Sequence, residues 1–126
     1  MKESNFQFSD PRLIFLKFDI NEDFEKDTYE GFSLNNDVTK LIISEGKEAL
    51  VILTLLIGDQ SNKSPFFIEL KMGAKFKCGD SCTFDKLIDT NAPAMLLSYA
   101  RPIVSLITSQ SGFSAFNIPF INFVNE

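Results

Sequence analysis

The chain has 126 residues, enough for one ordinary domain, and 44% of them are hydrophobic, which is typical of a globular protein rather than a disordered one. Its net charge of -5 argues against binding to nucleic acid, because no basic stripe is present to neutralise phosphates. The absence of histidine excludes Ser-His-Asp and Cys-His catalysis and the common zinc patterns, and no glycine-rich phosphate loop occurs, so we expect neither a metal nor another cofactor.

The N-terminal stretch, residues 1–11, is polar and predicts a flexible start to a single domain over residues 1–126. It lacks the apolar segment of a secretory signal, and the longest apolar run, residues 49–57, is too short to cross a membrane as a helix. We therefore expect a cytoplasmic protein with no membrane insertion. The spacing of Cys78 and Cys82 permits a disulfide, but the reducing compartment favours free thiols.

The first predicted strand begins at Leu13, where apolar and polar side chains start to alternate. Ile14, Leu16, Phe18 and Ile20 fall on one face of this strand, with charged and polar side chains on the other. An acidic connection follows over residues 21–31.

Three further strands are predicted over residues 32–43, 48–57 and 66–77. Residues 48–57 are apolar on both faces, so we expect both faces to be covered. Residues 66–77 alternate and have one wet face, on which Lys71, Lys75 and Lys77 are interpreted as solvated side chains. Because loops rather than helices join the four strands, the sheet is expected to be antiparallel.

Helical patterns occupy the second part of the chain, with a short helix predicted over residues 84–88 and the main helix over residues 92–109. Asn91 is the expected N-cap, Pro93 suits the first turn, and Gly112 supplies a stop. Pro102 lies inside the main helix and should kink or locally break it. The apolar tail over residues 113–126 is expected to pack back onto the fold.

The main helix is apolar around most of its circumference. Its polar strip is narrow and consists of Ser98, Arg101, Ser105 and Thr108. A helix that covers one sheet needs an apolar arc of about 100°, and this helix exceeds that arc. Since no second long helix is predicted, we expect self-association through this helix, the alternative being that the tail wraps it. The residues expected at the interface between copies are Leu96, Tyr99, Ile103 and Ile107.

From Asn91 onward, the sequence contains a proline near the helix start, Tyr99-Ala100-Arg101, Gly112 with Phe113, and a final Pro119-Phe120-Ile121-Asn122-Phe123. In these motifs and their order, it resembles the SecB family of bacterial export chaperones. Upstream, Phe66-Phe67-Ile68-Glu69 followed by Gly73 is similar to the last strand of the family, and Asp19-Ile20 to the edge of its first strand. Pro102 stands where the family usually has Glu, and the C-terminal helix of the family is missing after Asn125-Glu126.

The resemblance implies an α+β fold, in which a four-stranded antiparallel sheet has one long helix from the C-terminal half of the chain packed on one face. It implies a homotetramer built as a dimer of dimers, and an ATP-independent holdase that binds unfolded polypeptide clients and keeps preproteins competent for export. The residues implied to contact the SecA motor are Asp19, Asp23, Phe67 and Glu69. The aromatic residues expected to bind clients are Phe24, Tyr29, Phe32, Phe113 and Phe116.

Other functions remain compatible with these residues. Some SecB-like proteins are dedicated chaperones that guard one antitoxin within a toxin–antitoxin system. A module could also keep the fold for interactions without chaperone activity, because a fold does not fix a function. An enzyme is the least favoured class, since no catalytic constellation is present.

Overall fold

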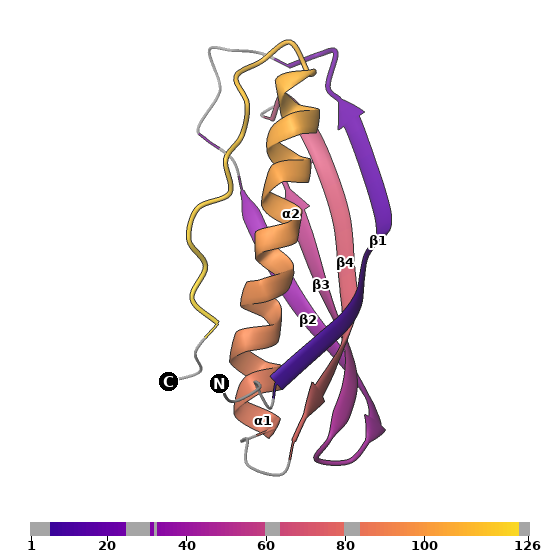
Figure 1. Ribbon diagram of the computed structural model, residues 1–126. Helices are drawn as coiled ribbons and strands as arrows, with labels where there is room; N and C mark the ends of the chain where they lie inside the picture. The colour runs from indigo at the N-terminus through magenta and orange to yellow at the C-terminus, as the bar shows by residue number, and fades with distance from the viewer. Residues whose placement is uncertain (1–5, 25–30, 32, 60–63, 80–83, 124–126) are drawn as a thin grey trace.

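The computed structural model describes residues 6–24, 31, 33–59, 64–79 and 84–123 of the chain. Its strands form one antiparallel sheet in the order β1-β4-β3-β2, and a long helix packs on one face of that sheet (Figure 1). This arrangement confirms the predicted α+β architecture. The elements are β1 (Phe6–Ile20), β2 (Leu34–Ser44), β3 (Glu48–Ile57), β4 (Phe66–Cys78), α1 (Phe84–Lys86), the π-helical turn η2 (Leu87–Asn91) and α2 (Ala92–Ser109).

The hydrophobic core lies between α2 and the two central strands. Burial alternates strictly along β3, so every second side chain points toward the helix. From α2, the core receives Leu96, Leu97, Ala100 and Val104, which lie on adjacent turns of one helical face. The strand residues that fill the core are Ala49, Val51, Leu53, Leu55, Ile57, Phe66, Ile68, Leu70, Met72, Ala74 and Phe76.

The first strand differs from its prediction at two points. It begins at Phe6 rather than Leu13, so residues 6–11, which were predicted to belong to a flexible start, are strand. Pro11 is tolerated there because β1 is an edge strand and its pairing with β4 is irregular between Ser9 and Arg12. A second register shift, between Leu13 and Phe15, acts as a bulge that redirects Ile14. Ile14 therefore lies on the face opposite to Phe18, although simple alternation placed both on one face.

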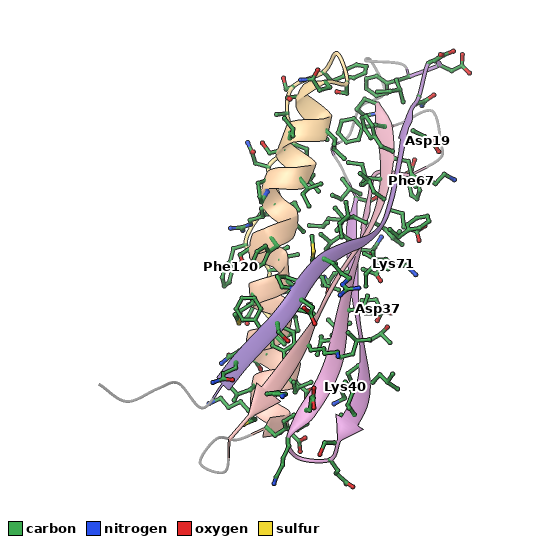
Figure 2. All side chains as sticks on the ribbon, turned by 45° about the vertical axis from the view of Figure 1, so that its right-hand side comes forward. Asp19, Asp37, Lys40, Phe67, Lys71 and Phe120 are labelled. Atoms are coloured by element: carbon green, nitrogen blue, oxygen red, sulfur yellow. The ribbon has the colours of Figure 1, made fainter. Side chains whose placement is uncertain are left out.

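The face of the sheet turned away from α2 is called the outer face below. Neither the described helices nor residues 113–123 lie over this face (Figure 2). The expectation that both faces of residues 48–57 are covered is therefore wrong for the described chain. The outward side chains of β3 are only half-buried, shielded by their neighbours in the sheet, and they are Leu50, Ile52, Thr54 and Leu56.

The beginning of α2 also departs from expectation. Asn91 has helical dihedrals and its side chain makes no capping hydrogen bond. The reason is continuity, because the backbone N–H of Ala92 donates to the Leu87 carbonyl and joins α2 to η2 without a free end. Pro93 occupies the first turn of α2, as predicted, and α2 continues through Pro102 without the predicted break.

The end of α2 confirms Gly112 as the point where the chain turns back. Gly112 adopts a φ of 88°, in the left-handed region that glycine occupies without a steric penalty. Residues 113–123 then run back along α2 toward the opposite end of the molecule (Figure 1). This segment, called the tail below, packs against the core through Phe116, Ile118, Ile121 and Phe123, as its apolar content predicted.

Two further outcomes concern the cysteines and the membrane. Cys78, the last residue of β4, is disulfide-bonded, which differs from the expectation of free thiols. Cys82 is the second cysteine of the sequence and lies outside the described residues. In the part of the chain that the structure describes, no helix combines the length and the apolar content needed to cross a bilayer.

Candidate functional site

The structure brings together two of the aromatic residues expected to bind clients. Phe24, just beyond β1, and Phe113, just beyond α2, meet edge to face with ring centroids 5.3 Å apart. The Phe24 N–H donates to the Asn21 carbonyl, and the Phe113 N–H donates to the Ser111 hydroxyl, so local turns orient both rings. Both rings are half-buried and retain surface that another chain can contact.

The other three expected client-binding residues have different outcomes. Phe116 is half-buried and packs against the core. Tyr29 and Phe32 lie outside the described residues, so the structure does not place them.

Thr108 fixes the tail to the helix. The sequence pattern placed this residue in the polar strip of α2, yet it is completely buried. Its hydroxyl donates to the Val104 carbonyl at 2.7 Å and accepts the Phe116 N–H at 2.8 Å. A polar side chain is stable in this core because both of its hydrogen-bonding roles are satisfied. Thr108 therefore determines where the tail starts its path along α2.

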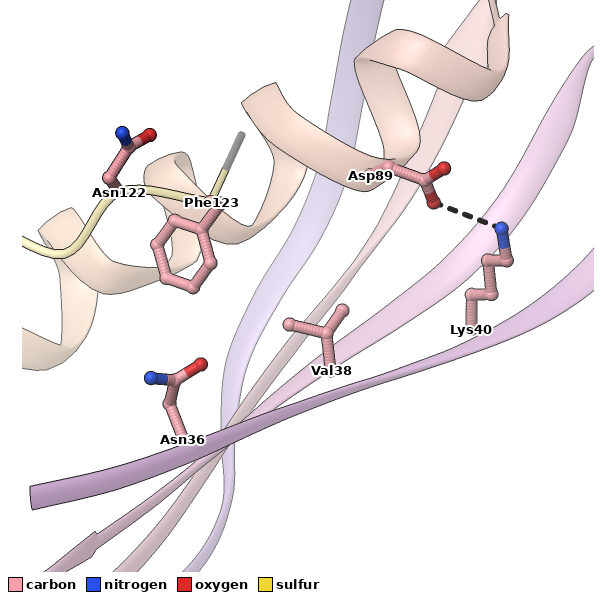
Figure 3. Close-up of a pocket in the computed structure, with 6 residues that line it drawn as sticks. All are labelled: Asn36, Val38, Lys40, Asp89, Asn122 and Phe123. Carbon is pink, nitrogen blue, oxygen red and sulfur yellow. Dashed lines mark hydrogen bonds and ion pairs between the residues drawn. The ribbon is translucent and has the colours of Figure 1, made fainter. Parts of the chain in front are cut away.

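A groove, called the tail groove below, separates the tail from β2 and η2. It has a volume of about 480 Å³ and is lined by Asn36, Val38, Lys40, Asp89, Asn122 and Phe123 (Figure 3). An ion pair between Lys40 Nζ and Asp89 Oδ1 closes one end at 2.9 Å. Since both of these side chains are 44% exposed, the pair contributes little to stability and can open.

A second hollow follows the tail on its other side, against α2. Its volume is about 350 Å³, and Arg101, Pro102, Ser105, Asn117 and Ile118 line it. Near both hollows, Phe120 projects from the tail and is 83% exposed. Figure 2 shows this ring on the side of the molecule away from the outer face. Shallow grooves with an apolar floor and amide groups in their walls suit an extended polypeptide better than one small rigid ligand.

Three of the four residues expected to contact a motor protein share the outer face near the end of β1, and Figure 2 labels two of them, Asp19 and Phe67. Asp19 lies directly opposite Phe67 in the register of β1 and β4, and Glu69 is two residues further along β4. Asp23 lies beyond the strand in an exposed turn, where its N–H donates to Asn21 Oδ1 at 3.1 Å.

Lys17 modifies this acidic surface, and the sequence analysis assigned it no role. Its Nζ is 3.6 Å from Asp19 Oδ2 and 6.0 Å from the centre of the Phe67 ring. It also lies opposite Glu69 in the strand register. A cation at the centre of the cluster reduces the negative potential that Asp19 and Glu69 present to a partner.

The residues expected at an interface between copies are unequal in exposure. Leu96 is buried within the chain, and Ile103 and Ile107 are half-buried. Tyr99 is 43% exposed and contacts Phe8 edge to face, with ring centroids 6.0 Å apart. Leu106, on the flank of the predicted interface stripe, is 65% exposed. The sheet and the tail thus leave part of the apolar surface of α2 uncovered.

Phe120, Phe123 and Thr108 are the site residues that sequence reasoning missed. The apolar tail was expected to pack back, but its spacing does not show that Phe120 points outward while Ile118 is buried. Among the described residues, no group of three or more histidine, cysteine, aspartate or glutamate side chains is suited to hold a metal ion.

Comparisons with known proteins agree on one relationship. A family model described as "Preprotein translocase subunit SecB" matches residues 22–125. A protein-export protein SecB from Cellvibrio japonicus (strain Ueda107) is 29% identical over 83 residues, which are 64% of this chain and 50% of that protein. The chain thus spans about half the length of this curated relative.

Solved structures share the fold. A SecB-like chaperone of Mycobacterium tuberculosis, in complex with a ChAD peptide from the HigA1 antitoxin, superposes with a TM-score of 0.66 at 15% identity, covering 94% of this chain and 91% of that one. A protein of unknown function from Streptococcus agalactiae superposes with a TM-score of 0.58 at 13% identity, covering 94% and 100% of the two chains.

Proposed function

Because the chain belongs to the SecB family, we propose that it is an ATP-independent holdase that binds unfolded polypeptides and keeps preproteins competent for export in the bacterial cytoplasm. The observation that carries this proposal is the exposed aromatic surface around the tail. Phe24 and Phe113 meet at one end of it, and Phe120 projects from its middle beside two open grooves. We propose no catalytic activity, in keeping with a family of chaperones.

Holding unfolded chains requires affinity for apolar side chains in many sequence contexts. Half-buried rings on a segment without regular secondary structure meet this need, because they can adjust to different clients. The amides and ion pair of the tail groove can satisfy the backbone of an extended client without reading its sequence. The client-binding set that we propose is Phe24, Tyr29, Phe32, Phe113 and Phe116, extended by Phe120.

We expect the chain to bind a chemically unfolded protein and not to bind the same protein when it is folded. ATP should change neither result. Fluorescence anisotropy of a labelled client measures both. Phe113→Ala should weaken binding of the unfolded client about tenfold, because it removes one aromatic contact and the ring against which Phe24 packs.

The matched control is Phe15→Ala, which removes a ring of equal size that is 44% exposed on the outer face. It should leave client affinity unchanged. Equal losses in the two variants would show that the tail surface is not the client site.

A dedicated chaperone is the second candidate function. It is favoured by the fold shared with the M. tuberculosis chaperone, which was solved with a peptide from an antitoxin. In this case the chain would bind one unfolded partner and no other in the same anisotropy experiment. An interaction module without chaperone activity would bind no unfolded client at all.

We further propose that the chain forms a homo-oligomer, with a dimer of dimers as the expected form. The uncovered apolar surface of α2 at Tyr99 and Leu106 supports this proposal, with Ile103 and Ile107 beside it. Ile103→Asp should dissociate the oligomer, because it places a charge in an apolar contact. Multi-angle light scattering measures the mass, and Ser109→Asp, at an exposed polar position of the same helix, is the control. An unchanged mass for Ile103→Asp would assign this residue to the core of one chain.

The SecA motor is a further proposed partner, through Asp19, Asp23, Phe67 and Glu69. The clustering of Asp19, Phe67 and Glu69 on one end of the outer face supports this contact. The position of Lys17 among them argues that any such contact relies on Phe67 as well as on charge.

A further inference from the structure

The outer face carries a separate hollow, close to the irregular register of β1 and β4. Ile14, Leu50 and Gly73 are among its lining residues, and its volume is about 430 Å³. A Cβ atom built on Gly73 would lie 2.6 Å from Cδ1 of Ile14 and 3.3 Å from Cγ1 of Ile52. The Ile14 side chain thus packs over Gly73, which is buried, and forms an apolar floor of the hollow together with Leu50.

Cationic side chains border this hollow. Arg12 and Lys75 line it together with one carboxylate, Asp10. Lys71 points to the same face two residues from Gly73. Neither of the two ion pairs formed among the described residues includes any of these three cations. Although the chain has a net charge of -5, these cations form a local positive region that can pair with the carboxylates of a partner.

Apolar side chains continue from the hollow across the sheet. Leu50 pairs with Leu41 on the edge strand β2, and Leu41 is 63% exposed. Ile52 lies opposite Gly73 in the register of β3 and β4 and is half-buried. An exposed apolar strip with a charged border is typical of an interaction surface.

Charge complementarity decides which partner fits. A bilayer of anionic lipid would also meet cationic and apolar groups, but it is flat and would press against the carboxylates of Asp37, Glu48 and Glu69, which share the outer face. A narrow protein segment can enter the hollow and pair with the cations without approaching those carboxylates.

We propose that this hollow binds an acidic segment of a partner protein, which inserts one aliphatic or aromatic side chain against Ile14 and Leu50 and places carboxylates against Arg12, Lys71 and Lys75. In an extended segment, side chains two residues apart share a face, so a carboxylate two positions from the inserted residue reaches the cationic border. This surface is distinct from the tail groove and is independent of client holding.

The test uses the full chain and a labelled synthetic peptide of eleven residues with a central phenylalanine. Glutamate stands two and four positions to either side of the phenylalanine, and leucine fills the other positions. A second peptide carries lysine in place of every glutamate. Fluorescence anisotropy should show binding of the acidic peptide, with affinity that falls as salt is raised, and markedly weaker binding of the lysine peptide. Lys75→Glu, by charge reversal, and Gly73→Leu, whose side chain would displace Ile14 from the floor of the hollow, should each weaken binding about tenfold. Lys86→Glu on α1 makes the same charge change at an exposed site elsewhere and should have no effect.

Three results would overturn the inference. The first is equal affinity for the two peptides, and the second is an unchanged affinity in Lys75→Glu. The third is binding of the chain to vesicles of phosphatidylserine and phosphatidylcholine, sensitive to Lys75→Glu, with no binding of the acidic peptide. Since an unfolded client occupies the tail surface, client binding by Lys75→Glu should equal that of the unchanged chain, which separates this inference from the proposed function.

Discussion

Gly58→Ala is expected to destabilise the fold by about 3 kcal/mol or more. Gly58 follows β3 and has a φ of 77°, which an L side chain rarely adopts. A Cβ atom at this position would also overlap the backbone carbonyl oxygen of Phe66, which cannot rotate away as a side chain would. The substitution therefore combines dihedral strain with a backbone shift at the start of β4. Urea unfolding followed by circular dichroism measures the loss as a lower midpoint.

Gly46→Ala is the matched control for the dihedral term alone. Gly46 has a similar φ of 73°, but a Cβ atom there would meet nothing within 4 Å. Its replacement should cost about 1 kcal/mol, the strain of a left-handed alanine. Similar losses for the two variants would show that the contact with Phe66 is relieved by relaxation.

Thr108→Val should destabilise the chain by about 1–3 kcal/mol and release the start of the tail. Valine fills almost the same volume, but it has no oxygen to accept the Phe116 N–H. That amide would lose its acceptor in a partly buried position, so the tail would open more often. Hydrogen exchange monitored by NMR should show faster exchange at Phe116 and along the tail, and urea unfolding gives the global loss.

Thr108→Ser separates the hydroxyl from the packing. Serine keeps the acceptor for Phe116 and loses only a methyl group, so protection of the Phe116 amide should persist despite a small loss of stability. If Thr108→Val left exchange at Phe116 unchanged, the hydroxyl would not be what holds the tail.

The sheet could be predicted from the sequence because its signal is local. Alternation along residues 66–77 and the apolar run of β3, interrupted by Thr54, give strand positions almost to the residue. The long helix was also predictable, from the spacing of Leu96, Ala100 and Val104. Alternation in residues 66–77 shows which face of that strand is apolar, whereas residues 48–57 are apolar on both faces and do not show which face is buried.

Features that depend on contacts between distant segments could not be predicted in this way. The bulge at Ile14 arises from pairing with β4, and alternation alone cannot reveal a register shift. Thr108 was assigned to solvent because it is polar, whereas its burial depends on the tail returning to use its hydroxyl. Asn91 does not cap α2 because η2 continues the helix on its N-terminal side. The residue type at position 91 does not reveal this continuation.

The candidate site was predictable in its residue types but only partly in its geometry. Phe24 and Phe113 were both singled out, yet nothing in the sequence shows that their rings touch. Lys17 was interpreted as part of a polar face, and its position between Asp19 and Glu69 appears only when β1 is paired with β4. The electrostatic effect of a charged side chain on a strand depends on which side chains lie opposite it on the neighbouring strand.

The most direct test of the proposed holdase is suppression of aggregation. A chemically unfolded protein unrelated to this chain is diluted into buffer without nucleotide, and light scattering is followed with and without the chain at a near-stoichiometric ratio. We predict that scattering stays low with the unchanged chain. With Phe113→Ala, scattering should rise to most of the level seen without any chain. Scattering that rises equally with the unchanged chain, with Phe113→Ala and with no chain at all would contradict the account.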